Sequence, residues 1–119
     1  MPRTTLNKTT LVGPYPPTLP VAADSLDLNF QACDIANLNQ FAPSGDDLII
    51  FNNTGASTYT VTITSAPDAL GRTGDIATYS LAAGDIAAFR VKSLGWVQTD
   101  GKVYLQGSNA SVKFAIVAL

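Results

Sequence analysis

Apolar and polar residues alternate with a period of two along much of this chain, and this pattern constrains its fold more than any other feature. The clearest example covers residues 59–64, where Tyr59, Val61 and Ile63 alternate with three threonines. Side chains that alternate in this way point to opposite faces of a β-strand, so one face can be buried while the other stays in water. The pattern predicts a half-buried strand at this position.

The same reasoning predicts about eight short strands separated by turn residues, which is typical of an antiparallel β-sandwich or small barrel, jelly-roll or Ig-like in style. Asp100-Gly101 is the strongest local signal for a hairpin turn. In the first predicted strand, Leu26, Leu28, Phe30 and Ala32 form the expected inward face. Besides residues 59–64, strands are expected at 26–32, 48–51, 76–81, 86–91, 96–99, 102–105 and 112–117. Periodicity leaves the strand order open.

Composition supports an all-β, single-domain protein. The chain has 119 residues, of which 46% are hydrophobic, enough for a core that needs no disulfide or metal. It contains no Glu, so it is poor in strong helix formers, and it contains no His and only one Cys, Cys33. These absences exclude His-based nucleophilic catalysis and thiolate zinc sites. We therefore expect a protein that is not an enzyme and has no cofactor, metal or catalytic residue.

Charge and hydropathy restrict the partners. Lys and Arg number seven against nine Asp, for a net charge of −2, which argues against nucleic acid as a partner. No apolar run approaches the length of a membrane span, and no secretion signal is recognisable at the N-terminus. We expect synthesis in a cytoplasm and no membrane association.

The N-terminal residues differ from the rest of the chain. Residues 1–25 contain five of the seven prolines, which favour extended backbone without ladder donors, and many threonines. We expect an extended arm over residues 1–25 and a β-body over 26–119, so that removal of residues 1–20 would leave the body folded. Apolar and cationic residues spaced along the arm are the candidate contacts with a partner or a neighbouring subunit: Arg3, Leu6, Lys8, Leu11, Val12 and Tyr15.

Three further features are candidates for interaction. In the loop after residue 64, Arg72 either pairs with Asp68 or Asp75 within the loop or contacts a neighbouring subunit. Trp96 and Tyr104 are the candidate aromatics for a ligand or an interface, because such rings stack on sugars but more often belong to a core or an interface. The adjacent carboxylates Asp46 and Asp47 should point to opposite faces of a strand, and we expect them to open a strand rather than converge on an ion.

The order of several short motifs between residues 32 and 105 resembles a group of small β-proteins encoded among the structural genes of tailed phages and prophages. The residues that carry the resemblance are Asp34, 37–39, Phe41, 45–48, 51–55, 60–65, Asp68, 71–73, Tyr79, 83–84, 100–101 and Val103. The resemblance implies a capsid decoration (cement, or auxiliary head) protein. Such proteins commonly form trimers over junctions between capsid hexamers, often with an extended N-terminal segment on the shell.

From the resemblance we expect a virion protein on the capsid exterior, made in the bacterial cytoplasm, with the major capsid protein and its own copies as partners and no catalytic residues. Two alternatives remain open. One is a carbohydrate- or receptor-binding module of a tail fibre or adhesin, with a platform around Trp96 or Tyr104. The other is a head–tail joining or tail-tube protein, which would assemble as a ring.

Overall fold

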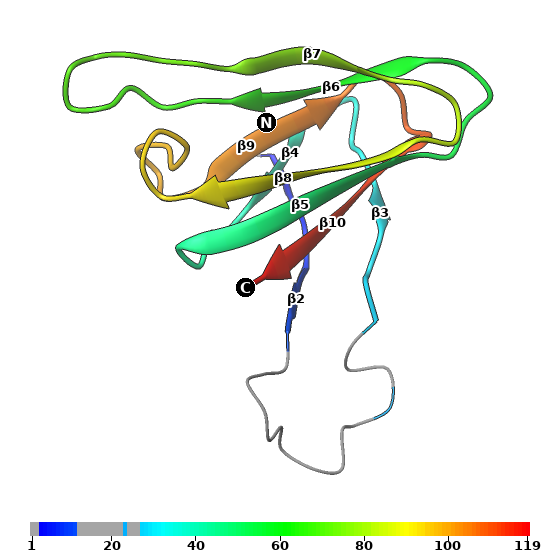
Figure 1. Ribbon diagram of the computed structural model, residues 1–119, viewed down its shortest axis with the longest axis horizontal. Helices are drawn as coiled ribbons and strands as arrows, with labels where there is room; N and C mark the ends of the chain where they lie inside the picture. The colour runs from blue at the N-terminus through cyan, green and yellow to red at the C-terminus, as the bar shows by residue number, and fades with distance from the viewer. Residues whose placement is uncertain (1–2, 12–22, 24–26) are drawn as a thin grey trace.

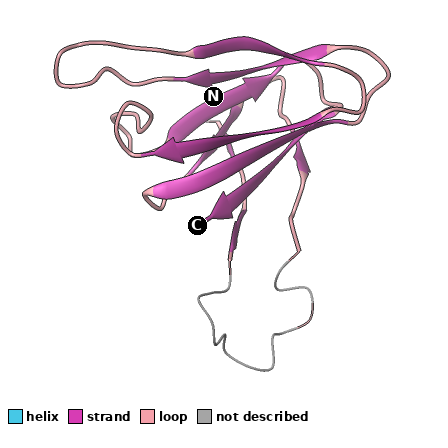
Figure 2. Ribbon diagram, viewed as in Figure 1, coloured by secondary structure: helices cyan, strands magenta, loops and turns pink. Residues whose placement is uncertain are grey.

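A computed structural model describes residues 3–11, 23 and 27–119 of the chain. These residues form ten β-strands and no helix, so the all-β prediction is confirmed (Figure 2). The strands are arranged in two sheets, each of which contains both parallel and antiparallel pairs (Figure 1). Within the described residues, no helix is long and apolar enough to cross a bilayer.

The first sheet has five strands, with β9 at its centre and β7 at one edge. Its antiparallel pairs are β4 with β9, β9 with β6, and β6 with β7, whereas β1 is parallel to β4. In spatial order the strands are β1 (Thr4–Thr5), β4 (Asn39–Phe41), β9 (Val103–Gly107), β6 (Tyr59–Thr64) and β7 (Ile76–Leu81).

The second sheet is built on the two long strands β10 and β5, with β8 at one edge. Two short strands share the other edge of β10: β2 runs parallel to it beside residues 116–118, and β3 runs antiparallel beside residues 113–114. The strands are β2 (Lys8–Thr10) and β3 (Gln31–Ala32) on β10 (Val112–Ala118), followed by β5 (Asp46–Asn53) and β8 (Ile86–Lys92).

One hydrophobic core lies between the two sheets. As predicted, Val61 and Ile63 point inward from β6, and Phe41 on β4 has no exposed surface. The second sheet contributes Phe51 and Phe114, whose rings meet edge to face with centroids 5.9 Å apart. Side chains from both sheets therefore share one buried cluster, which holds the sheets together by apolar burial.

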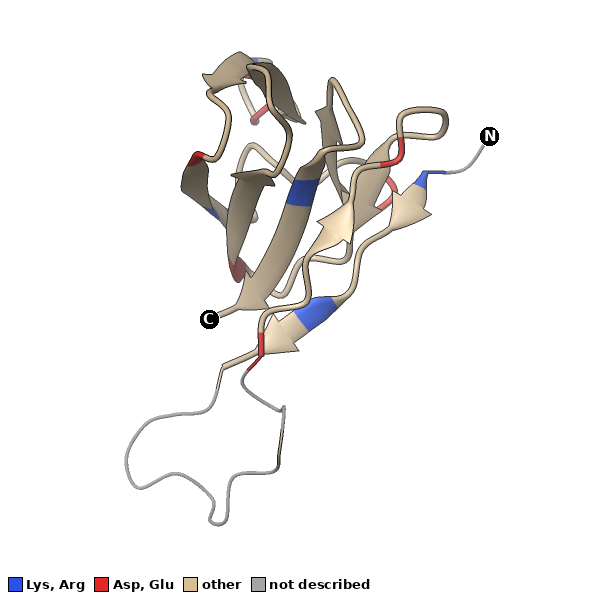
Figure 3. Ribbon diagram, turned by 90° about the vertical axis from the view of Figure 1, so that its right-hand side faces the viewer, with Lys and Arg blue, Asp and Glu red and all other residues tan. Residues whose placement is uncertain are grey.

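The described N-terminal residues belong to the two sheets rather than to a separate arm. β1 pairs with β4 in the first sheet and β2 pairs with β10 in the second, so residues 3–11 cross from one sheet to the other (Figure 3). Between these strands Leu6 is only 4% exposed and packs in the core. The body therefore includes residues 3–11 and does not begin at residue 26. Residues 12–22 and 24–26 lie outside the described part of the chain.

The strand expected over residues 26–32 is much shorter in the structure. Only Gln31–Ala32 pairs with β10, and Leu28, which we expected to point inward, is 40% exposed. The reason is competition for one edge, because β2 already occupies β10 beside residues 116–118. The alternation at 26–32 could not show that β2, about twenty residues earlier in the chain, pairs with the same edge. Leu26 lies outside the described residues.

The strand expected at 96–99 is also wrong, because this segment forms turns. Gly95 has a positive φ of 86°, and the amides of Trp96 and Val97 both donate to the carbonyl of Ser93. The tight turn directs the Trp96 ring back onto Phe89, edge to face at 5.2 Å. Packing against the core therefore outweighs the β-propensity of this short segment.

The Asn53 side chain links the second sheet to the first by hydrogen bonds, and its replacement is expected to destabilise the protein. Its side chain is fully buried; its Nδ2 donates to the carbonyls of Ser57 and Leu81, both at 2.8 Å, and its Oδ1 accepts from the Gly55 amide at 2.9 Å. Asn53→Ala would leave these groups without their partner, and we expect it to lower the free energy of unfolding by about 2–4 kcal/mol. Chemical denaturation measures the change. Asn52→Ala, on the outward face of the same strand, is the control and should change it by less than about 0.5 kcal/mol.

Candidate functional site

The structure separates the six N-terminal candidate residues into three groups. Arg3 and Leu6 are engaged within their own chain: Arg3 donates to the carbonyl of Asn39 at 3.0 Å, and Leu6 is buried in the core. Leu6 is therefore not available to a partner, in contrast to our expectation. Lys8 and Leu11 are exposed, Leu11 to 47%, at the β10 edge of the second sheet. Val12 and Tyr15 lie outside the described residues.

Arg3, Tyr104 and Asp100 form a polar cluster on the outer face of the first sheet. The Arg3 guanidinium lies 4.1 Å from the centroid of the Tyr104 ring, a cation–π contact. The Tyr104 hydroxyl donates to the Asp100 carboxylate, which lowers the pKa of Asp100 and raises the pKa of Tyr104. Because Arg3 covers one face of the ring, a sugar could stack on that face only if Arg3 moved away.

Trp96, the other aromatic candidate, belongs to the packing of the body. It is partly buried, and its ring contacts Phe89 on β8 edge to face. It does not lie beside Tyr104 on a common hairpin, because residues 96–98 form no strand with β9. The structure therefore does not bring the two aromatic candidates together into one platform.

Arg72 forms the ion pair within its loop that was one of the two expected arrangements. Its Nε lies 2.7 Å from Oδ2 of Asp68, while the side chain as a whole remains largely exposed. The same carboxylate accepts the backbone amides of Leu70 and Arg72. These bonds, first of all the one from the Arg72 amide, hold the pKa of Asp68 below its usual value and fix the loop between β6 and β7.

Three other carboxylates, those of Asp34, Asp46 and Asp47, also have structural partners. Asp46 points outward and pairs with Arg90, whereas Asp47 points inward and accepts the amide and hydroxyl of Ser44, so these two neighbours do not converge. Asp34 accepts the Thr4 hydroxyl and thereby ties β1 to the loop before β4. No group of three or more metal-binding side chains occurs among the described residues.

The stability of the protein is expected to fall in acid and to be flat near neutrality. Hydrogen bonds lower the folded-state pKa of Asp34, Asp46, Asp68, Asp75 and Asp100. A lowered folded-state pKa means that the unfolded chain binds more protons in acid. This contribution is therefore complete above the unfolded-state pKa near 3.9 and is lost as the pH falls through the folded-state values.

Melting temperatures measured across the pH range test this expectation. With no His in the chain, the curve should be level between about pH 5 and 8 and should drop below about pH 4. Asp34→Asn should make the drop shallower. A curve whose steepest change lies near pH 6.5 would contradict this explanation.

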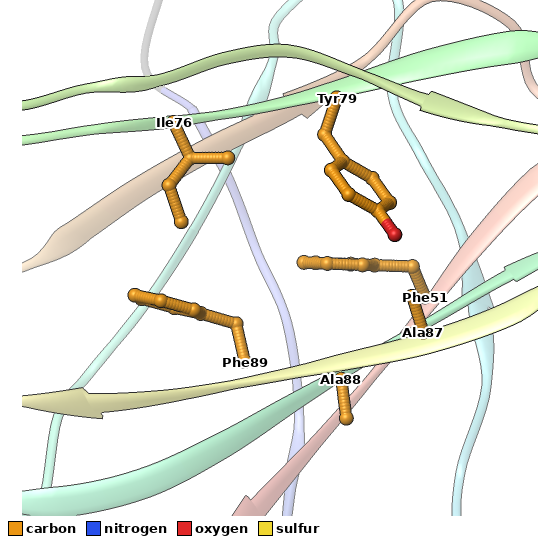
Figure 4. Close-up of a pocket in the computed structure, with 6 residues that line it drawn as sticks. All are labelled: Phe51, Ile76, Tyr79, Ala87, Ala88 and Phe89. Atoms are coloured by element: carbon orange, nitrogen blue, oxygen red, sulfur yellow. The ribbon is translucent and has the colours of Figure 1, made fainter.

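An apolar cavity that the sequence did not indicate opens between the edge strands β7 and β8. It has a volume of about 140 Å³ and is lined by Phe51, Ile76, Tyr79, Ala87, Ala88 and Phe89 (Figure 4). Alternation would place Ile76 and Tyr79, three residues apart, on opposite faces of β7. They share a face because Tyr79 pairs with Val61 and Ile76 with Ile63, so that two residues of β7 lie opposite one residue of β6. Thr78, in this bulge, has a positive φ of 50°.

Comparison of the chain with protein-family models, with curated proteins and with solved structures found no match.

Proposed function

We propose that this chain is a non-enzymatic virion protein that decorates and stabilises the outer surface of a phage capsid, as a homotrimer bound to the major capsid protein. We further propose that the two sheets form a β-sandwich of the jelly-roll or Ig-like kind. The resemblance of residues 32–105 to small phage structural proteins supports this assignment. Those residues extend from the end of β3 to the middle of β9 and so account for most of the two sheets.

The observation that carries the proposal is the way in which the body holds the Pro-rich segment. Leu11 and Asp27 flank this segment, and both lie at the edge of the second sheet where β2 and β3 meet. The Thr9 hydroxyl donates to the carbonyl of Asp27 at 3.1 Å, and the Asn7 amide donates to Oε1 of Gln31 at 2.7 Å. The stretch from residue 12 to residue 26 is therefore attached to the body at both ends.

A contact segment attached at both ends suits a decoration protein. Docking of a flexible tail loses much conformational freedom, and fixing both ends of the segment reduces that loss. Each apolar side chain that the shell buries contributes roughly 1.5–3 kcal/mol before ordering costs. Val12, Tyr15, Leu19 and Val21 supply such side chains. Many modest contacts, repeated over a symmetric shell, then give a stable layer.

The alternative of a carbohydrate- or receptor-binding module has less support. It requires an open aromatic platform at Trp96 or Tyr104, but Trp96 packs on Phe89 and Arg3 covers a face of Tyr104. The third alternative, a head–tail joining or tail-tube protein, would also use a small β-body. It differs from the decoration role in where the protein binds on the phage.

Co-sedimentation with phage heads tests the proposed function. The full chain is mixed with expanded heads that lack decoration and, in parallel, with unexpanded heads and with a glycan panel. We expect saturable binding to expanded heads and none to the glycans. Binding to glycans without binding to heads would replace the proposal by the receptor-binding alternative.

A further inference from the structure

We infer that the cavity between β7 and β8 receives the Pro-rich segment of a second copy of this chain, residues 14–20. This inference concerns self-association and does not depend on binding to a capsid. The sequence of the segment is Pro-Tyr-Pro-Pro-Thr-Leu-Pro.

The cavity has the shape and chemistry of an aromatic groove. Phe51 lies at its floor, 3% exposed, and is supported from behind by Phe114. Phe89 and Ile76 also line the cavity, and Tyr79, which is 48% exposed, extends from β7 toward β8 (Figure 4). Apart from the Tyr79 hydroxyl, the side chains that line the cavity are apolar.

Proline-rich chains are well suited to such a groove. They adopt the polyproline II conformation with little loss of freedom, and their rings pack against aromatic side chains. Their carbonyls are not used in internal hydrogen bonds, so a tyrosine hydroxyl such as that of Tyr79 can donate to one of them. The segment and the groove are therefore complementary in chemistry.

The edges beside the groove favour side-chain docking over addition of a strand. β7 and β8 are the terminal strands of their sheets, but the bulge at Thr78 makes the edge of β7 irregular. In addition, four of the seven residues in 14–20 are prolines, which cannot donate to a β-ladder. Packing of proline rings into the cavity requires neither a regular strand edge nor backbone donors from the segment.

The position of the segment in the chain points to a second copy. Leu11 donates to the carbonyl of Ala118 at the β10 edge of the second sheet, whereas the groove lies at the β8 edge. Three strand spacings, about 14 Å, separate β2 from β8. Pro14 follows Leu11 by three residues, which span at most about 11 Å. Pro14 therefore cannot reach the β8 side of its own groove, whereas exchange between copies, each giving a segment and offering a groove, can seat the segment from Pro14 onward and close a ring.

Light scattering and fluorescence over a concentration series of the full chain test the inference. The wild-type chain should associate, and the emission of Trp96, which contacts the groove wall at Phe89, should change over the same concentration range. Tyr79→Ala, and separately the double substitution Pro16→Ala with Pro17→Ala, should each weaken association by about tenfold or more. Ile86→Ala, 65% exposed on the outward face of β8 and outside the cavity lining, is the matched control and should associate as the wild type does.

Three results would overturn the inference: a wild-type chain that stays monomeric at every concentration, association that survives both sets of substitutions, or association weakened by one set alone. A circular dichroism spectrum equal to that of the wild type, and a cooperative thermal transition, verify that the Tyr79→Ala variant is folded. A monomer that binds heads would refute this inference and the proposed homotrimer, and would leave the decoration role itself standing. An oligomer that does not bind heads would support this inference and refute the proposed decoration role.

Discussion

A chain that begins at residue 12 is expected to lose its stable fold. Removal of residues 1–11 deletes β1 and β2, takes Leu6 out of the core and leaves the β10 edge beside residues 116–118 without its partner. Loss of one buried leucine already costs about 2–5 kcal/mol. The backbone pairing adds to this, and a domain of this size has only about 5–15 kcal/mol of stability in all. Circular dichroism and urea denaturation of the truncated chain measure the outcome.

Two point substitutions separate the role of the core from a general effect of the N-terminus. Leu6→Ala should lower the free energy of unfolding by about 2–5 kcal/mol, because it leaves a cavity between the sheets. Leu11→Ala, at a side chain that is 47% exposed, should change it by less than about 0.5 kcal/mol. A truncated chain that unfolds with the wild-type free energy would show that residues 3–11 are an arm after all.

Replacement of residues 12–22 by Gly and Ser, at equal length, is expected to leave the body folded, in contrast to the truncation, but to abolish its binding to heads. The strands on either side remain, and a connection of unchanged length keeps the same loop-closure cost. The apolar side chains proposed to contact the shell are lost, so co-sedimentation with expanded heads should fall to background. The circular dichroism spectrum should stay that of the wild type.

A control for this variant is Leu70→Ser, which removes an exposed apolar side chain from the loop between β6 and β7. It should bind heads as the wild type does. Undiminished binding by the 12–22 replacement would refute the proposed role of the Pro-rich segment.

The strands from β5 to β10 could be predicted because their apolar patterns are local and turn residues separate most of them. Asp100-Gly101 is an exception, because it forms a turn but no strand directly precedes it, so the expected hairpin is absent. The N-terminal strands could not be predicted in this way. β1 and β2 contain two and three residues, too few to show a period, and each is defined by a partner far along the chain. The prolines that follow make the whole region look like one extended arm, although the buried Leu6 separates residues 3–11 from what comes next.

The candidate site could be predicted only in part, for the same reason. Trp96 and Tyr104 stand out in the sequence as rare aromatics, but packing and Arg3 engage them within the chain. The groove depends on a bulge at Thr78, a residue type that rarely adopts a positive φ, and on which strands end the two sheets. Neither can be predicted from periodicity, because both depend on pairings between strands.

The most direct test of the proposed function is the number and position of bound copies on expanded phage heads, determined by cryo-electron microscopy of saturated particles. We expect many copies spread with the symmetry of the shell, clustered in threes on its outer surface. A single ring at one vertex would identify a joining protein, and heads that stay bare at saturating protein would contradict the decoration role.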